Sequence, residues 1–207
     1  MPIAGASLRI PNAVSLLFQD SEVRLVMRYT AAIAVLALGT LLPGSAFPAS
    51  GEKNMSFTIS SSSFSDGGTI DRKFSCDGAD VSPQLSWTEP PSGTKTLALL
   101  VDDPDAPVGN WSHWVLWNLP PGKRSLAEGA AKSATLPDGS HQGSNDFRKT
   151  GYKGPCPPPG KPHRYYFKLY ALDVKLELRS GSGKRDLEAA MKGHILGQTE
   201  WMGRYGR

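Results

Sequence analysis

The chain of 207 residues lacks most of the short motifs that carry recognisable chemistry. It has no Gly-x-Ser-x-Gly elbow, which argues against a common serine hydrolase arrangement, and no glycine loop of the kind that cradles phosphates. Its only cysteines are Cys76 and Cys156, with no Cys-x-x-Cys pair and no paired Cys/His spacing, so we expect no structural zinc site. Internal repeats are also absent, which argues against a repeat architecture.

An excess of one charge sign is equally missing. The net charge is +4 with histidine neutral, and residues 1–50 hold three arginines against two acids, which leaves +3 for the remainder. This charge is spread along the chain, and no Lys/Arg cluster alternates with aromatic residues as in a nucleic-acid groove. We therefore expect no nucleic-acid partner.

The sequence has no apolar run of the roughly twenty residues that a membrane-spanning helix needs. The longest candidate, residues 31–42, follows Arg28 and precedes a stretch of small residues. A positive start, a short apolar core and small residues are the pattern of a secretory signal. Residues 27–49 are therefore expected to direct export to the periplasm or the exterior, with cleavage after Ala46 or Ala49. An uncleaved membrane anchor is the alternative.

The residues before this segment show no sustained periodicity and no motif. We expect translation to start at Met27, so that residues 1–26 are either not translated or disordered. Residues 50–207 have the length of one domain, and a domain of that length can bury a hydrophobic core.

Glycine and proline, with 22 and 17 copies, punctuate the chain and favour antiparallel sheets with long loops over helices. The predicted fold class is mainly β, with one short C-terminal helix. That helix is expected at residues 184–192, where apolar residues share one face and Gly193 ends it. Strands are expected at residues 57–59, 73–75, 85–87, 96–101, 115–119 and 164–172, the last being the final strong strand, with residues 122–160 nearly all loop.

The connection between two of these strands is both rigid and rich in titratable groups. From Pro104 to Ser112 it contains two prolines, a glycine and an asparagine, which predicts a fixed loop. Asp102 and Asp103 stand at its start and His113 at its end. Such groups on a rigid loop between buried strands are typical of a ligand site.

Three strands each have an apolar face that finishes in a polar group, because side chains alternate along a strand. If these strands are neighbours, their polar ends meet at the rim of one sheet, which predicts a pocket. For either histidine alone, a hydrogen bond to a backbone carbonyl is the simpler interpretation. The three faces are Leu97, Leu99, Val101 and Asp103; His113, Val115 and Trp117; and His163, Tyr165, Phe167, Leu169 and Ala171.

Three motifs follow one another through this region. They are Asp103-Pro104-Asp105-Ala106-Pro107, then Trp111-Ser112-His113-Trp114 with Asn118, and then Gly154-Pro155-Cys156-Pro157-Pro158-Pro159-Gly160 running into Pro162-His163-Arg164-Tyr165. Their order and spacing resemble the phosphatidylethanolamine-binding protein family, most closely its prokaryotic Raf kinase inhibitor-like branch, from about Phe57 to near the C-terminus. The resemblance implies an antiparallel β-sheet sandwich.

The resemblance also implies a small anion pocket that accepts phosphate-like head groups. It places residues 143–147 and both cysteine-bearing loops near that pocket, and it makes a cis Ala106–Pro107 bond an expectation. Whether Cys76 and Cys156 form a disulfide in an exported protein or stay free and buried is open. The implied ligand-binding residues are Asp103, Asp105, Pro107, His113, Gly154, Pro157, His163 and Tyr165.

The same residues bear on whether the site is catalytic. Two histidines and a carboxylate could hold a metal ion for a hydrolase, with Asp103 or Asp105 as the carboxylate. A nucleophilic hydrolase needs a nucleophile beside its histidine, but Ser112 neighbours His113 on a strand and so points to the opposite face. Anion binding needs only histidine, tyrosine and backbone N–H donors, with a carboxylate to orient a histidine or accept from a ligand ammonium.

The sequence therefore favours a non-enzymatic binding protein for phosphate-like molecules or phospholipid head groups, which could also act as an inhibitor or regulator. In that site His113, His163 and Tyr165 would donate to one anion while Asp103 orients a histidine. The alternatives are an inhibitor that docks on a kinase or protease and has a vestigial pocket, and a metal-dependent hydrolase. We expect no cofactor and no bound metal, and either a monomer or a homodimer.

Overall fold

The computed structural model describes residues 56–207. The predictions for residues 1–55, including the export signal, therefore lie outside the described part of the chain. Within residues 56–207, no helix is long and apolar enough to cross a membrane.

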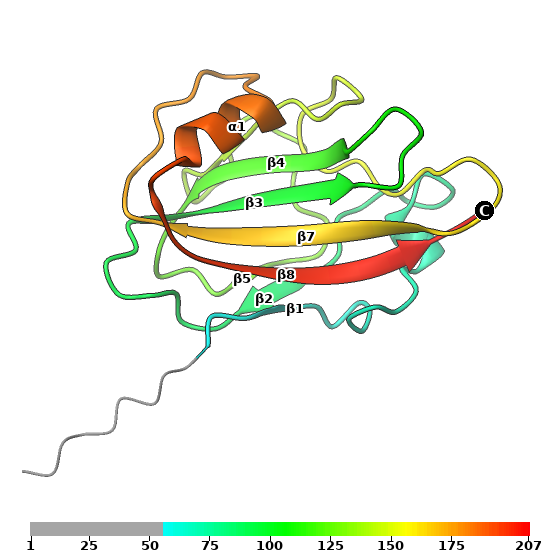
Figure 1. Ribbon diagram of the computed structural model, residues 1–207, viewed down its shortest axis with the longest axis horizontal. Coiled ribbons are helices and arrows are strands. Elements are labelled where there is room, and N and C mark those ends of the chain that lie inside the picture. Colours follow the sequence, from blue (N-terminus) through cyan, green and yellow to red (C-terminus); the bar gives the residue numbers. More distant parts are fainter. Residues whose placement is uncertain (1–55) are drawn as a thin grey trace, which may run out of the picture. The chain divides into compact units, whose positions relative to one another are not determined.

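Two antiparallel sheets dominate the fold, as the sequence predicted (Figure 1). The smaller sheet has the order β1-β2-β5 and the larger sheet the order β6-β4-β3-β7-β8. The strands are β1 (Ile59–Ser60), β2 (Leu85–Trp87), β3 (Thr96–Asp103), β4 (Trp111–Leu119), β5 (Ser125–Leu126), β6 (His141–Gln142), β7 (His163–Leu172) and β8 (Ile195–Tyr205), and the α-helix is α1 (Lys184–Met191).

The larger sheet is buried on both faces near its centre. All eight residues of β3 are buried. On one face, Leu99 and Phe167 belong to a core shared with Leu85 of the smaller sheet. On the other face, Leu100 packs in a second core with Leu187 of α1. Figure 1 shows α1 and the smaller sheet on opposite sides of the larger one. Burial on both faces explains why β3 reads as a continuous apolar run.

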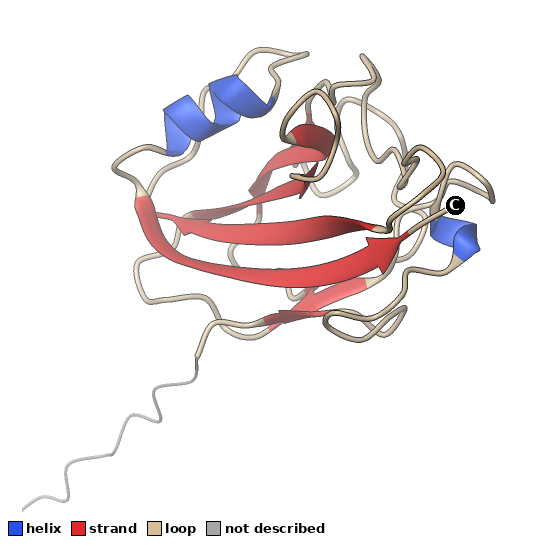
Figure 2. Cartoon of the chain, turned by 45° about the vertical axis from the view of Figure 1, so that its right-hand side comes forward, coloured by secondary structure: helices blue, strands red, loops and turns tan. Residues whose placement is uncertain are grey.

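Some predicted elements are wrong. Residues 73–75 do not form a strand: Arg72–Phe74 is a 3-10 helix because the Asp71 carboxylate accepts from the Lys73 N–H at 2.7 Å and caps its start. This short helix and α1 lie at opposite ends of the folded domain (Figure 2). The prediction that residues 122–160 are nearly all loop is confirmed, because β5 and β6 in this region have only two residues each.

The largest error is β8, a strand of 11 residues that follows the predicted last strand. Glycines interrupt the apolar side of its alternation. At Gly203 a side chain would lie 2.5 Å from Ile70 and 2.8 Å from Phe64, so close packing demands a residue without one. The remaining inward residues, including Trp201 and Tyr205, still alternate and are the signal that could have identified the strand.

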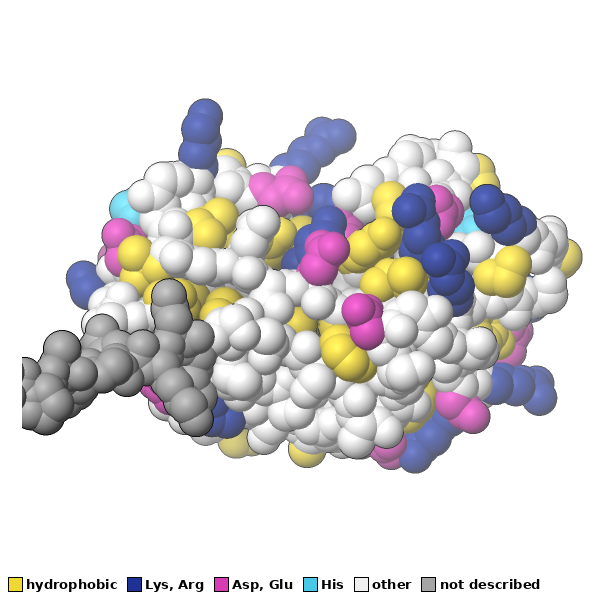
Figure 3. All heavy atoms as spheres, turned by 60° about the horizontal axis from the view of Figure 1, so that its bottom comes forward, with side chains coloured by type: hydrophobic (Ala, Val, Ile, Leu, Met, Phe, Trp, Pro, Cys, Tyr) yellow, Lys and Arg dark blue, Asp and Glu magenta, His cyan; other side chains and the backbone are white. Residues whose placement is uncertain are grey.

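The surface carries charges of both signs. Figure 3 shows lysine and arginine side chains lying among aspartate and glutamate side chains on one face. This mixture agrees with the low net charge of the sequence.

A buried carboxylate joins α1 to the larger sheet. Asp102, which is 1% exposed, lies 2.8 Å from the Lys184 ammonium of α1 and 3.2 Å from that of Lys168 on β7. The Asn110 side chain donates to the same carboxylate at 2.9 Å. Asp102 therefore ties the helix, the sheet and the β3–β4 loop together.

We expect Asp102→Ala to lower the free energy of unfolding by about 3 kcal/mol or more, because Lys184 would stay largely buried without its counter-ion. Urea unfolding measures the change. The control is Glu128→Ala, which breaks an exposed pair with Lys73 and should cost less than about 1 kcal/mol. Equal effects of the two substitutions would contradict this account.

Candidate functional site

Three strand ends from the larger sheet meet at a small cavity of about 160 Å³. β3 ends there, β4 begins there, and β7 begins there because it runs antiparallel to β3 (right-hand end in Figure 1). The structure thus brings together the three predicted polar residues. The lining consists of Asp103, His113 and His163 with Ala106, Pro107, Val108, Trp111, Phe147, Cys156, Pro157 and Pro158.

His113 reaches the cavity through an irregularity in β4. Val101 of β3 pairs with Trp114 and Asp102 pairs with Ser112, so His113 is an extra residue opposite β3. Such a β-bulge re-aims side chains. The prediction that His113 shares a face with Val115 and Trp117 is wrong, because those two residues pack against α1 in the second core. His113 instead packs edge-on against Tyr165, at 5.2 Å between ring centres, on the cavity side.

Asp103 holds His163 in one orientation. Its Oδ2 lies 2.8 Å from the His163 Nδ1, and its Oδ1 accepts from the backbone N–H of Asp105 at 2.8 Å. Because a carboxylate accepts, Nδ1 carries the hydrogen and the Nε2 atom of His163 is left for a ligand. This is the orienting contact that the sequence analysis assigned to Asp103.

His113 is fixed by the backbone instead. Its Nδ1 donates to the Lys153 carbonyl oxygen at 2.7 Å, and the Lys153 N–H donates to the His113 carbonyl at 2.9 Å. The side chain also packs against Phe147. Burial lowers the pKa of His113 below its usual value, and this effect outweighs the nearby carbonyl groups and Asp103, which raise it. A neutral imidazole is therefore favoured.

Tyr165 lies beneath the cavity rather than in its wall. The residue is 1% exposed, and its hydroxyl has no hydrogen-bond partner among the described residues. Burial and then the charge of Asp103 raise the pKa of this phenol well above its usual range. Tyr165 supports His113, and the structure does not place it among the residues that line the cavity.

Two other predicted residues face elsewhere. The Asp105 carboxylate accepts from the backbone N–H, Nε and one terminal nitrogen of Arg164 at 2.7–2.9 Å, and this contact holds the pKa of Asp105 well below its usual range. The Gly154 N–H donates to Asp80, and a side chain there would meet the Phe74 carbonyl at 2.1 Å. Both residues fix the loops around the cavity and do not line it.

The loops supply an apolar rim. Pro107 and Pro157 line the cavity, as do Val108, Trp111 and Phe147, which the sequence analysis did not assign to the ligand-binding set. The signal was available, because Val108 follows the first motif, Trp111 belongs to the second, and Phe147 ends the segment 143–147 that the resemblance places near the pocket. The expected cis Ala106–Pro107 bond is wrong, because the described residues contain no cis peptide bond.

A disulfide closes one wall of the cavity. Cys76 and Cys156 are bonded, with Cα atoms 5.4 Å apart, and Cys156 lines the cavity. The Cys76 N–H also donates to the Pro155 carbonyl at 3.0 Å. The chain from 154 to 158 is thereby anchored to a loop that lies eighty residues earlier.

The metal-ligand set considered for a hydrolase is not assembled. Asp105 is paired with Arg164, and Asp103 is paired with the Nδ1 of His163. Residues 56–207 contain no group of three or more His, Cys, Asp and Glu side chains that could hold a metal ion.

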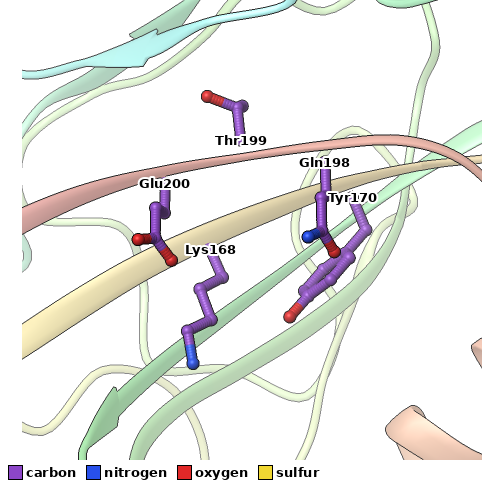
Figure 4. Close-up of a pocket in the computed structure, with 5 residues that line it drawn as sticks. All are labelled: Lys168, Tyr170, Gln198, Thr199 and Glu200. Atoms are coloured by element: carbon purple, nitrogen blue, oxygen red, sulfur yellow. The ribbon is translucent and has the colours of Figure 1, made fainter.

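Another hollow, of about 290 Å³, lies on β7 and β8. Figure 4 shows Lys168, Tyr170, Gln198 and Glu200 pointing to one side of the two strands and Thr199 to the other. None of the predicted site residues lines it. The cavity at the strand ends is therefore the candidate site.

Comparison with known proteins gives one consistent result. The family model described as "Phosphatidylethanolamine-binding protein" matches residues 60–206. A UPF0098 protein of Methanothermobacter thermautotrophicus is 50% identical over 144 residues, which cover 70% of this chain and 95% of the relative. A UPF0098 protein of Aquifex aeolicus is 44% identical over 151 residues, covering 72% and 88%.

Two solved structures share the fold. Escherichia coli YbcL, described as a member of the mammalian PEBP family, is 34% identical with a TM-score of 0.69 and covers 73% of this chain and 98% of its own. A phosphatidylethanolamine-binding protein homologue from Chlamydia trachomatis is 42% identical with a TM-score of 0.67 and the same coverage. The resemblance noted in the motifs and the predicted fold class are both confirmed.

Replacing both cysteines by serine is expected to lower the free energy of unfolding by about 4 kcal/mol, because the bond closes a loop of eighty residues. Chemical denaturation of the oxidised, reduced and double-serine proteins measures the change. Alkylation of two thiols in the native oxidised protein would rule out the bond.

The buried His113 should make stability depend on pH. Because its folded pKa lies below that of the unfolded chain, the unfolded state binds the extra proton, and stability is lost as pH falls below about 6.5. The contribution is at most about 1.4 kcal/mol per pH unit. Urea unfolding of the wild type and His113→Gln between pH 5 and 8 measures it; a slope that does not differ between the two proteins would be the contrary result.

Proposed function

The chain belongs to the phosphatidylethanolamine-binding protein family, and from this premise we propose that its cavity binds a small phosphate-like anion, either free or as a phospholipid head group. The observation that carries the proposal is the Asp103–His163 pair at the cavity wall. A protonated His163 beside the Asp103 carboxylate presents its Nε2–H to a ligand, and a charge-assisted hydrogen bond from this atom favours an oxyanion.

The size and lining of the cavity support the same ligand class. A volume of about 160 Å³ is below the roughly 300–1,000 Å³ of sites for drug-sized molecules, so it suits a single head group. Around the histidines, the rim is apolar, and Val108 at its edge is 76% exposed. A polar floor with an apolar rim fits an anionic group that is attached to a less polar remainder.

We propose binding rather than catalysis. The hydroxyl of Ser112 is fully buried and does not line the cavity, although the residue adjoins His113. Tyr165, the other hydroxyl near the histidines, is buried with its pKa raised, which makes it a poor nucleophile. The histidines therefore have no hydroxyl nucleophile within the cavity lining on which to act.

We also propose that the protein works outside the cytoplasm. The signal pattern of residues 27–49 is the sequence basis. The Cys76–Cys156 bond supports the proposal, because disulfides persist mainly in oxidising compartments.

His163→Ala should weaken the binding of inorganic phosphate and phosphoethanolamine by about ten- to a hundred-fold, because a charge-assisted hydrogen bond contributes about 1.5–3 kcal/mol. Isothermal titration calorimetry measures the change. His194→Ala is the matched control, since His194 pairs with Asp173 at 2.8 Å but both side chains are nearly half exposed and neither lines the cavity. Equal affinity in all three proteins, with unchanged thermal unfolding, would place the function on another surface.

A further inference from the structure

The two histidines of the cavity are oriented through the same ring nitrogen by different partners. In each ring Nδ1 faces an oxygen that can only accept, the Lys153 carbonyl for His113 and the Asp103 carboxylate for His163. Each Nδ1 therefore carries a hydrogen. Among the described residues neither Nε2 atom has a hydrogen-bond partner, so in both rings this is the nitrogen left for a ligand.

We propose that the cavity selects oxyanions that carry a proton, such as hydrogen phosphate, over fully ionised ones such as sulfate, because His113 presents a hydrogen-bond acceptor and His163 a donor. This inference rests on the proposed function and narrows the ligand of the same site to a phosphate that keeps a P–OH group, because the phosphodiester of a phospholipid head group has none. It assigns His113 a role opposite to the donor role expected from the sequence.

His113 is the acceptor because its second proton is disfavoured. The ring is 2% exposed and packs between Phe147 and Tyr165. Its Nδ1–H bond is to a neutral carbonyl, so no carboxylate is hydrogen-bonded to the ring to stabilise an imidazolium. Burial lowers the pKa of this residue accordingly. A neutral ring with the hydrogen on Nδ1 offers a lone pair at Nε2.

His163 differs in having an ionised partner. The Asp103 carboxylate lies 2.8 Å from its Nδ1 and neutralises the charge of an imidazolium. An approaching anion adds a second negative group on the Nε2 side. The protonated ring then donates from both nitrogens, one to Asp103 and one to the ligand.

A ligand that meets both nitrogens needs an unprotonated oxygen for His163 and a protonated oxygen for His113. Hydrogen phosphate has both, whereas sulfate of the same charge and shape has no proton to give. In a sulfate complex the His113 lone pair would face a negative oxygen and stay unpaired in a buried site. Leaving one buried polar group unpaired corresponds to about a ten- to a hundred-fold loss of affinity.

The first test is calorimetric titration of the oxidised wild-type protein with inorganic phosphate and with sulfate at pH 7. We expect phosphate to bind at least about tenfold more tightly. In His113→Gln the side-chain amide can turn its NH₂ toward the ligand, so sulfate should gain affinity and the ratio should approach one. The matched control His194→Gln should keep the wild-type ratio.

The second test does not depend on a variant. Long-range ¹H–¹⁵N correlation spectra of the wild type distinguish protonated from bare ring nitrogens, and we expect a bare His113 Nε2 with and without phosphate. A protonated Nε2, or equal affinities for phosphate and sulfate, would overturn the inference and leave the proposed function standing. If neither anion binds, the proposed function falls, and the inference falls with it.

Discussion

Two adjacent carboxylates at the end of β3 set the plan of this protein. Because β3 is buried on both faces and side chains alternate, Asp102 and Asp103 point to opposite sides of the sheet, and each needs a partner there. Asp102 meets the lysine of α1, which docks the helix on one side. Asp103 meets His163, which builds the cavity on the other. The carboxylate that stabilises the fold and the carboxylate that faces the cavity therefore lie on opposite faces of the same strand.

Much of the fold could be predicted because its strands have clear patterns. The face of β7 from His163 to Ala171 alternates without interruption, and the structure buries it as predicted. The continuous apolar run of β3 and the apolar face of α1 were equally readable. The order of the loop motifs indicated which strand ends carry the polar residues, so the sequence alone placed Asp103, His113 and His163 together.

The remainder depends on contacts that no local pattern records. Asp105 is an aspartate two residues beyond Asp103, yet its contact with Arg164 turns it away from the cavity. Gly203 interrupts the apolar alternation by which β8 could be recognised, and the residue that requires a glycine there, Ile70, is distant in sequence. The disulfide could not be chosen over two buried thiols from spacing alone, since pairing requires the two loops to approach. In each case the sequence shows the residue type but does not show which residue it contacts.

The bulge in β4 has a consequence for relating this chain to others. His113 faces the cavity because β4 has one more residue than β3 between paired positions, and its identity alone does not place it there. A chain that lost Ser112 would lose the bulge, and it could keep every cavity residue type and still turn the imidazole toward the other face. An alignment that matches residue types across a gap at this point would then assign a site that the protein does not have. A change in chain length at this point therefore affects the site even where the residue types are kept.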